Sequence, residues 1–240
     1  MKRRILTVVC IVCVLILSTA FSARNPWTCP DCGKTASISV INLIDAGDTV
    51  RLKELFNGSL NSAVCPGCGR KLVAPCDLTY KDVNPPFILF EMPREDETPV
   101  EEIELKMDEL ATEIFAKANL PRPTVRITFS RADFIEKIAI RRMGFDDRLL
   151  EFAKLQLFRT VEEPQLMQSR HRLLLDYSHC TDEILAFLIY DLEDGKFVNS
   201  LHVPMEEFKS LVHSYENDRE AQLELEAAFP GCYVSAEKLL

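Results

Sequence analysis

The sequence lacks an excess of positive charge, because its 240 residues carry 28 Lys and Arg against 37 Asp and Glu. The resulting net charge of −9 repels phosphate backbones, and no basic run of any length opposes that repulsion. Low-complexity tracts are absent, and the only internal repeat is one pair of cysteine motifs. Nucleic acid is therefore not an expected partner, and the length predicts a folded protein with one large or two smaller domains.

One uncharged hydrophobic run lies near the start of the chain. The letters "MKRR" precede the apolar residues 5–17, and the small and polar letters "STAFSA" follow them. This order is typical of an export signal, with cleavage after Ala20 or Ser22. Extended to Ala23, the run approaches the roughly 20 residues that span a membrane. Residues 1–23 are therefore predicted to be a signal peptide or, through residues 5–23, a membrane anchor. The rest of the chain is then expected outside the cytoplasm, secreted or held at the cytoplasmic membrane.

Hydrophobic periodicity and turn signals divide the remaining chain into residues 24–93 and 94–240. Alternating apolar residues predict strands, and residues such as Asp48, Ser130 and Asp146 are typical helix N-caps. At Thr98 a capping box with proline in the first helical position predicts the start of a long helix. The predicted strands cover residues 35–46, 86–93, 121–130, 171–177, 184–191 and 196–203. The predicted helices cover residues 48–58, 98–118, 130–142, 146–158 and 218–229, and a further helix that includes Phe208, Leu211 and Val212 is predicted to start at Pro204.

Two short motifs, "CPDCG" at residues 29–33 and "CPGCG" at residues 65–69, are the repeated pair. Two thiolates separated by two residues can bind one tetrahedral ion from a single tight turn. The glycine after each second cysteine permits the positive φ that lets backbone N–H groups point at sulfur. Basic residues follow both motifs and are placed to offset the charge of four thiolates. The pattern predicts a zinc ribbon whose Zn²⁺ ligands are Cys29, Cys32, Cys65 and Cys68.

A redox role is the alternative interpretation of the same motifs. Cys-Pro-x-Cys is also a form of thiol–disulfide exchange sites, and an exported protein meets oxidants. Such sites lower the pKa of a thiol at a helix N-terminus, whereas here both motifs lead into strand-like sequence. Two copies with the same glycine and basic residues favour one shared ion, which leaves no open coordination position for catalysis.

At this point the residues resemble a known family. The motifs "CPDCG" and "GSLNSAVCPGCG" are similar to those of the bacterial CpXC family, which is named for them. The similarity continues through "LTYKD", "FILFEMP" and "SRADFIEKIAIRRMGFDDRLLEFAKLQL", and so covers roughly residues 25–165. The resemblance implies a metal site formed by the same four cysteines and a shared architecture. It implies no particular activity.

Other candidate residues have simpler interpretations. Cys76, Cys180 and Cys232 are expected to pack in the interior, although an odd number of cysteines also allows one reactive thiol. A nucleophile at Cys180, with His202 or His171 as base, lacks an accompanying turn motif or oxyanion donor. Asp146 and Asp147 are expected to cap a helix. Trp27 is expected to pack on the ribbon. No catalytic residue is assigned.

The sequence therefore predicts an α+β protein, with an N-terminal zinc ribbon in residues 24–93 packed on a mixed helix and strand domain in residues 94–240. The expected function is non-enzymatic binding or scaffolding of a protein partner outside the cytoplasm. A thiol–disulfide redox protein is the alternative.

Overall fold

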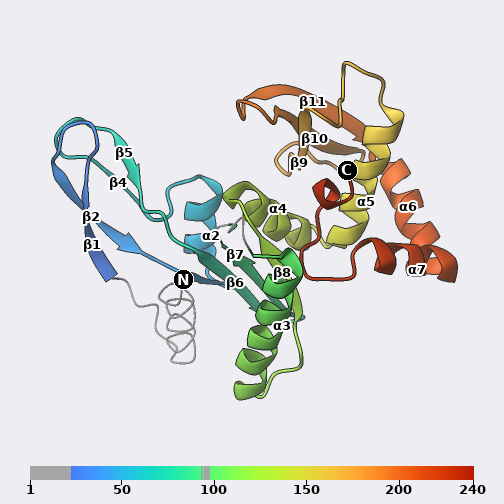
Figure 1. Ribbon diagram of the computed structural model, residues 1–240, viewed down its shortest axis with the longest axis horizontal. Helices are drawn as coiled ribbons and strands as arrows, with labels where there is room; N and C mark the ends of the chain where they lie inside the picture. Colours follow the sequence, from blue (N-terminus) through green and yellow to red (C-terminus); the bar gives the residue numbers. More distant parts are fainter. Residues whose placement is uncertain (1–22, 93, 95–97) are drawn as a thin grey trace. The chain divides into compact units, whose positions relative to one another are not determined.

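The computed structural model describes residues 23–92, 94 and 98–240 (Figure 1). The chain forms two compact units, Met1–Phe129 and Ser130–Leu240, and both contain helices and strands, which confirms the α+β class. Except for Ala23, the predicted export signal lies outside the described residues. None of the helices in the described ranges is both long and apolar enough to cross a membrane.

The first unit begins with two small antiparallel hairpins. Strands β1 (Ala23–Thr28) and β2 (Thr35–Val40) form one, and β4 (Ser62–Val64) and β5 (Lys71–Val73) form the other. The two hairpins lie side by side with their turns at the same end (Figure 1). Trp27 packs against their shared small core as expected, and the buried members of that core are Cys29, Ala36, Ile38, Cys65, Leu72 and Ala74.

A four-stranded mixed sheet completes the first unit. Its strand order is β3 (Leu43–Asp45), β6 (Leu78–Val83), β7 (Pro86–Glu91) and β8 (Thr124–Thr128). The outer pairs β3–β6 and β7–β8 are parallel, and β6–β7 is antiparallel. All four central residues of β7 are buried, which is typical of a strand covered on both faces.

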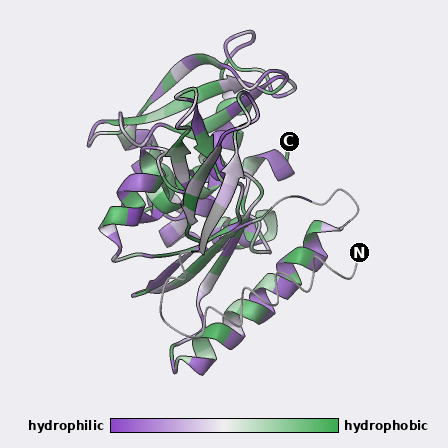
Figure 2. Cartoon of the chain, turned by 90° about the vertical axis from the view of Figure 1, so that its left-hand side faces the viewer, coloured by the Kyte–Doolittle hydropathy of each residue, from purple (hydrophilic) through white to green (hydrophobic). Residues whose placement is uncertain are grey.

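Two helices connect the strands of this unit. Helix α2 (Thr49–Phe56) begins at Asp48, whose carboxylate accepts a hydrogen bond from the backbone N–H of Arg51, as predicted. Helix α3 (Val100–Lys117) begins at Pro99 without a side-chain cap, so the predicted capping box at Thr98 is wrong. Proline occupies the N-cap position itself and has no side-chain acceptor. Green and purple alternate along α3, the long helix at the lower right of Figure 2, because its buried residues are apolar except for Glu104 and acidic residues lie on its exposed side.

The second unit has a three-stranded antiparallel sheet in the order β11 (Phe197–Pro204), β10 (Ile184–Asp191) and β9 (His171–Leu175). Its helices are α4 (Arg131–Arg142), α5 (Asp147–Thr160), α6 (Met205–Asn217), α7 (Arg219–Ala228) and the short 3₁₀ helix η1 (Ala236–Lys238). The core-facing side of the sheet contributes Leu185, Phe187 and Ile189 to one large apolar cluster shared with α5, α6 and α7. As predicted, Ser130 and Asp146 cap α4 and α5.

A buried group of charges joins α4 to α5. Lys154 Nζ lies 2.8 Å from Glu136 and 3.1 Å from Glu151, and Lys137 Nζ lies 3.0 Å from Glu151. The backbone N–H of Ala236 in η1 donates to Glu151 at 2.9 Å, and that of Leu175 in β9 donates to Glu136. Each buried charge therefore has several partners, as burial of ions requires.

Candidate metal centre

Each Cys-Pro-x-Cys-Gly motif closes one hairpin with the same tight turn. In the first turn (residues 29–34), the N–H of Gly33 donates to the carbonyl of Cys29 at 2.9 Å, and the N–H of Cys29 donates to the carbonyl of Lys34 at 2.8 Å. In the second (residues 65–70), the corresponding bonds are Gly69 to Cys65 at 3.0 Å and Cys65 to Arg70 at 2.8 Å. Gly33 and Gly69 have φ of 71° and 76°, a region that favours glycine. We call these the first and second knuckles.

The two knuckles bring four sulfur atoms together. All four Sγ atoms lie within 4.8 Å of one another. Cys29 Sγ lies 3.6 Å from Cys68 Sγ, and Cys32 Sγ lies 3.4 Å from Cys65 Sγ. A tetrahedral site with metal–sulfur bonds of about 2.3 Å has sulfur–sulfur edges of about 3.8 Å. The four thiols form no disulfide, and their spacing fits one metal ion.

The backbone around the second knuckle favours negative charge on sulfur. The N–H groups of Cys68 and Gly67 lower the pKa of Cys65 to about 6. The N–H of Lys34 also lowers the pKa of Cys32, but the neighbouring Cys65 thiol and burial outweigh it and raise that pKa to about 12. The two pKa shifts thus favour a thiolate at Cys65 and a protonated thiol at Cys32, which share one hydrogen bond. A bound cation would replace the shared proton and favour the thiolate form of both sulfurs, which makes the group a suitable cation ligand.

Only some of the basic residues that follow the motifs lie near the four thiols, where they were expected to offset negative charge. Arg70 forms an ion pair with Asp31 of the first knuckle, and this pair together with the thiols raises its pKa. The stem of Lys34 crosses to the second knuckle and passes close to Gly67. Lys71 instead donates to the carbonyl of Gly58 at 2.6 Å, outside the knuckles. Two of the three basic residues therefore bridge the knuckles.

The family model described as "CpXC protein" matches residues 27–154, which is more than half of the chain. The chain belongs to the CpXC family. Comparison with curated proteins and with solved structures gave no match. The CpXC match includes both knuckles and the mixed sheet, and it ends inside α5, so it extends into the second unit.

Asn61 supports the CpXC knuckles, and the sequence alone gave no reason to single it out. Its buried amide accepts from the N–H of Ile41 and donates to the carbonyl of Ile41, both at 2.8 Å. It also donates to Cys76 Sγ at 2.9 Å. The φ of Asn61 is 54°, so the residue turns the chain while its side chain ties the end of β2 to β4. The only sequence signal was the tolerance of asparagine for this conformation.

The disfavoured interpretation of Cys180 as a nucleophile gains no support in the second unit. His179 and Cys180 lie in a turn after β9, not on a strand, and His179 Nδ1 lies 2.8 Å from Asp176. Burial raises the pKa of the Cys180 thiol, which disfavours the reactive thiolate. His171 Nδ1 accepts from the N–H of Met167, away from this turn. Cys180 is half-buried against the core, in agreement with a packing role.

Of the remaining candidates, Asp146 caps α5 as expected, whereas Asp147 is the first residue of α5 and pairs with Lys137. Asp146 also holds Arg148, and Asp147 lies 3.2 Å from Lys137. Cys232 is buried in the second unit. Both aspartates have structural partners, Arg148 for Asp146 and Lys137 for Asp147, and both are distant in the sequence from the four clustered cysteines.

Proposed function

We propose that Cys29, Cys32, Cys65 and Cys68 hold one structural Zn²⁺ as a zinc ribbon. The observation that carries this proposal is the spacing of the four sulfur atoms, which fits a tetrahedral site with all four positions filled by protein. Zn²⁺ bound there would stabilise the folded ribbon, and binding energies of structural zinc are on the order of 10 kcal/mol. The Arg70 guanidinium supports this assignment, because a zinc with four thiolates keeps a negative charge.

The CpXC chain as a whole is then best explained as a non-enzymatic binding or scaffold protein for a protein partner. A closed coordination set leaves no position for a substrate, so the metal would serve folding. The letters of residues 1–23 support export or anchoring through residues 5–23, and with it a role outside the cytoplasm. Fractionation of the producing cells tests this placement, and recovery of the chain in the cytoplasmic fraction would contradict it.

Elemental analysis of the purified full chain under mild reduction tests the metal. The expected result is one zinc per chain, retained on dialysis. Cys32→Ser should lose the zinc, and the matched control Cys180→Ser should keep it, because Cys180 lies outside the knuckles. A chain without zinc whose knuckle thiols are oxidised in pairs would contradict the proposal.

A thiol–disulfide redox protein is the second candidate, and the lowered pKa of Cys65 favours it. Two close sulfur pairs, Cys32–Cys65 at 3.4 Å and Cys29–Cys68 at 3.6 Å, join different knuckles, so a disulfide between the knuckles is as accessible as one within a Cys-Pro-x-Cys motif. Each motif also leads into a strand, β2 or β5, and no helix N-terminus adjoins it. Reductase activity of the zinc-free chain on a disulfide substrate would support this candidate over the zinc ribbon.

A further inference from the structure

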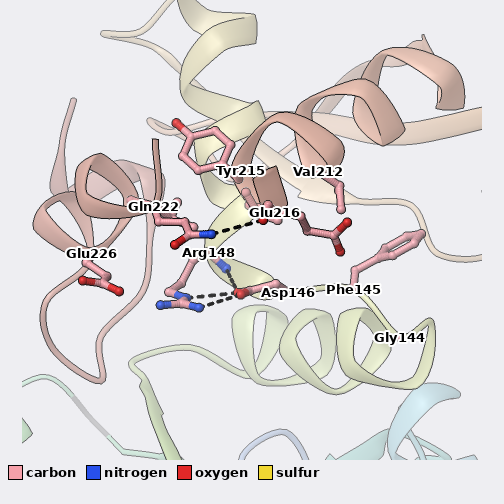
Figure 3. Close-up of a pocket in the computed structure, with 11 residues that line it drawn as sticks. Gly144, Phe145, Asp146, Arg148, Val212, Tyr215, Glu216, Gln222 and Glu226 are labelled. Carbon is pink, nitrogen blue, oxygen red and sulfur yellow. Dashed lines mark hydrogen bonds and ion pairs between the residues drawn. The ribbon is translucent and has the colours of Figure 1, made fainter. Parts of the chain in front are cut away.

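A second site lies in the second unit, at a cavity of about 430 Å³ between the α4–α5 connection and helices α6 and α7 (Figure 3). This volume lies within the range of small-molecule sites. The apolar part of its lining consists of Phe145, Leu149, Val212, Leu225 and the ring of Tyr215. Burial raises the pKa of Tyr215 to about 12, so this ring stays neutral.

The one cation in the lining is already neutralised. Arg148 donates to Asp146 from Nε at 3.2 Å and from Nη2 at 2.7 Å, and the Asp146 carboxylate also caps α5. Hydrogen bonding to Asp146 raises the pKa of Arg148, which keeps its charge fixed in this pair. The two charges cancel within the lining, so the remaining groups decide which ligand fits.

Two further carboxylates of the lining, Glu216 of α6 and Glu226 of α7, add two negative charges, and the charge of Glu226 also acts on Arg148. Within the part of the chain that the structure describes, neither carboxylate forms a hydrogen bond or an ion pair. Figure 3 shows them on opposite sides of Arg148, so the two negative charges are separated across the cavity. A ligand that matches this lining carries two positive charges joined by an apolar body.

We propose that this cavity binds an aliphatic diamine. One ammonium group pairs with Glu216 and the other with Glu226, and the methylene chain between them packs on Leu225 and Val212. The Tyr215 ring offers an additional surface for a cation. This site is independent of the knuckles and of the metal.

An NMR titration of the full chain with cadaverine tests the proposal. The amides of residues 144–149 should shift in a saturable manner, and pentanol, which has the same carbon chain without charge, should leave them unchanged. Pentylamine should bind more weakly than cadaverine. Each of Glu216→Gln and Glu226→Gln should weaken cadaverine binding about two- to fivefold, the range for exposed ion pairs.

The matched control is Glu207→Gln, which removes an exposed acidic group of α6 outside the cavity and should leave the affinity for cadaverine unchanged. No saturable shift with millimolar cadaverine would overturn the proposal. Equal binding of pentanol would also overturn it, since the cavity would then select apolar volume alone. An equal loss of affinity in Glu207→Gln and Glu226→Gln would show attraction by overall charge, and would overturn the assigned contacts.

Discussion

At the scale of single residues, the two knuckles differ at the third position of the motif, where the first has Asp31 and the second has Gly67. A Cβ atom on Gly67 would lie 2.9 Å from Cys32 Sγ and 2.8 Å from Lys34 Cδ. The lysine stem can move, but the sulfur is one of the four clustered atoms. Contact between the knuckles therefore requires glycine at this position.

Gly67→Ala is expected to weaken metal binding about tenfold, because it displaces Cys32 Sγ and the N–H that Gly67 directs at Cys65 Sγ. The measurement is competition for zinc against a chelator. Gly47→Ala is the control, since a Cβ there meets no atom within 4 Å. Equal zinc affinities of the two variants would contradict the requirement for glycine.

Asn61→Asp is expected to destabilise the first unit by about 2 to 3 kcal/mol, because a carboxylate would face the buried carbonyl of Ile41 in place of a donor. The chain has a single tryptophan, Trp27, whose fluorescence during urea unfolding reports on this unit. Asn119→Asp is the control, because Asn119 has the same φ of 54° but is exposed. A similar loss in both variants would assign the effect to the backbone conformation.

At the scale of helices and strands, the buried charges between α4 and α5 predict an acid-sensitive second unit. Burial alone would raise the pKa of Glu151, but Lys137, Lys154 and the N–H of Ala236 outweigh it and lower the pKa from 4.5 to about 2. A carboxyl with a lowered folded-state pKa stabilises the fold above its unfolded pKa. That stabilisation is lost as the pH falls from about 4.5 to about 2.

Glu151→Gln should therefore cost about 3 kcal/mol or more at pH 7, since it leaves two buried ammonium groups short of a partner. It should also flatten the loss of stability between pH 4.5 and 2. Hydrogen exchange of the β9 and β10 amides measures both effects. The exposed Glu162→Gln is the control and should behave as the unchanged chain. An acid profile of Glu151→Gln identical to that of the unchanged chain would refute this assignment.

The elements of this unit also show what the sequence could predict. Helix α4 was predicted from the Ser130 cap to its end at Arg142, because cap, periodicity and the Gly144 stop are local signals. The burial of Glu136, Lys137, Glu151 and Lys154 was not predicted. Each of these residues, taken alone, is typical of a solvated helix face, and only the contact between two helices makes them partners.

In the first unit, too, local sequence signals predicted some features, but contacts between distant segments were not predicted. The four cysteines were predicted to act together from their spacing, and the structure brings them together. The order β3-β6-β7-β8 was not predicted, because strand pairing depends on contacts distant in the sequence. Strand β6 carries Lys81 and Asp82 and has little apolar alternation, so the sequence alone did not identify it as a strand.

At the scale of the whole molecule, the division into two units predicts that loss of the metal acts on one of them. Cys32→Ser should unfold the hairpins of the first unit, seen as a change in Trp27 fluorescence. The β10 amides should keep their hydrogen-exchange protection, because Leu185, Phe187 and Ile189 of β10 belong to the apolar core of the second unit. Full retention of ribbon structure and melting temperature in Cys32→Ser would contradict a structural metal. Cys180→Ser is the control for loss of a thiol.

Because the two knuckles are far apart in the sequence, a metal ion bound to both would also close a long loop of the chain. Cys29 and Cys68 are 39 residues apart, and the segment between them contains β3, the edge strand of the mixed sheet, and α2. An ion that joins them closes this segment into a loop and removes roughly 4 kcal/mol of chain entropy from the unfolded state, as a disulfide of that span would. Without the ion, β3 is more easily released, and the edge of β6 then becomes available to another chain. If a metal ion is bound at the knuckles, its loss is thus expected to be detected first as aggregation.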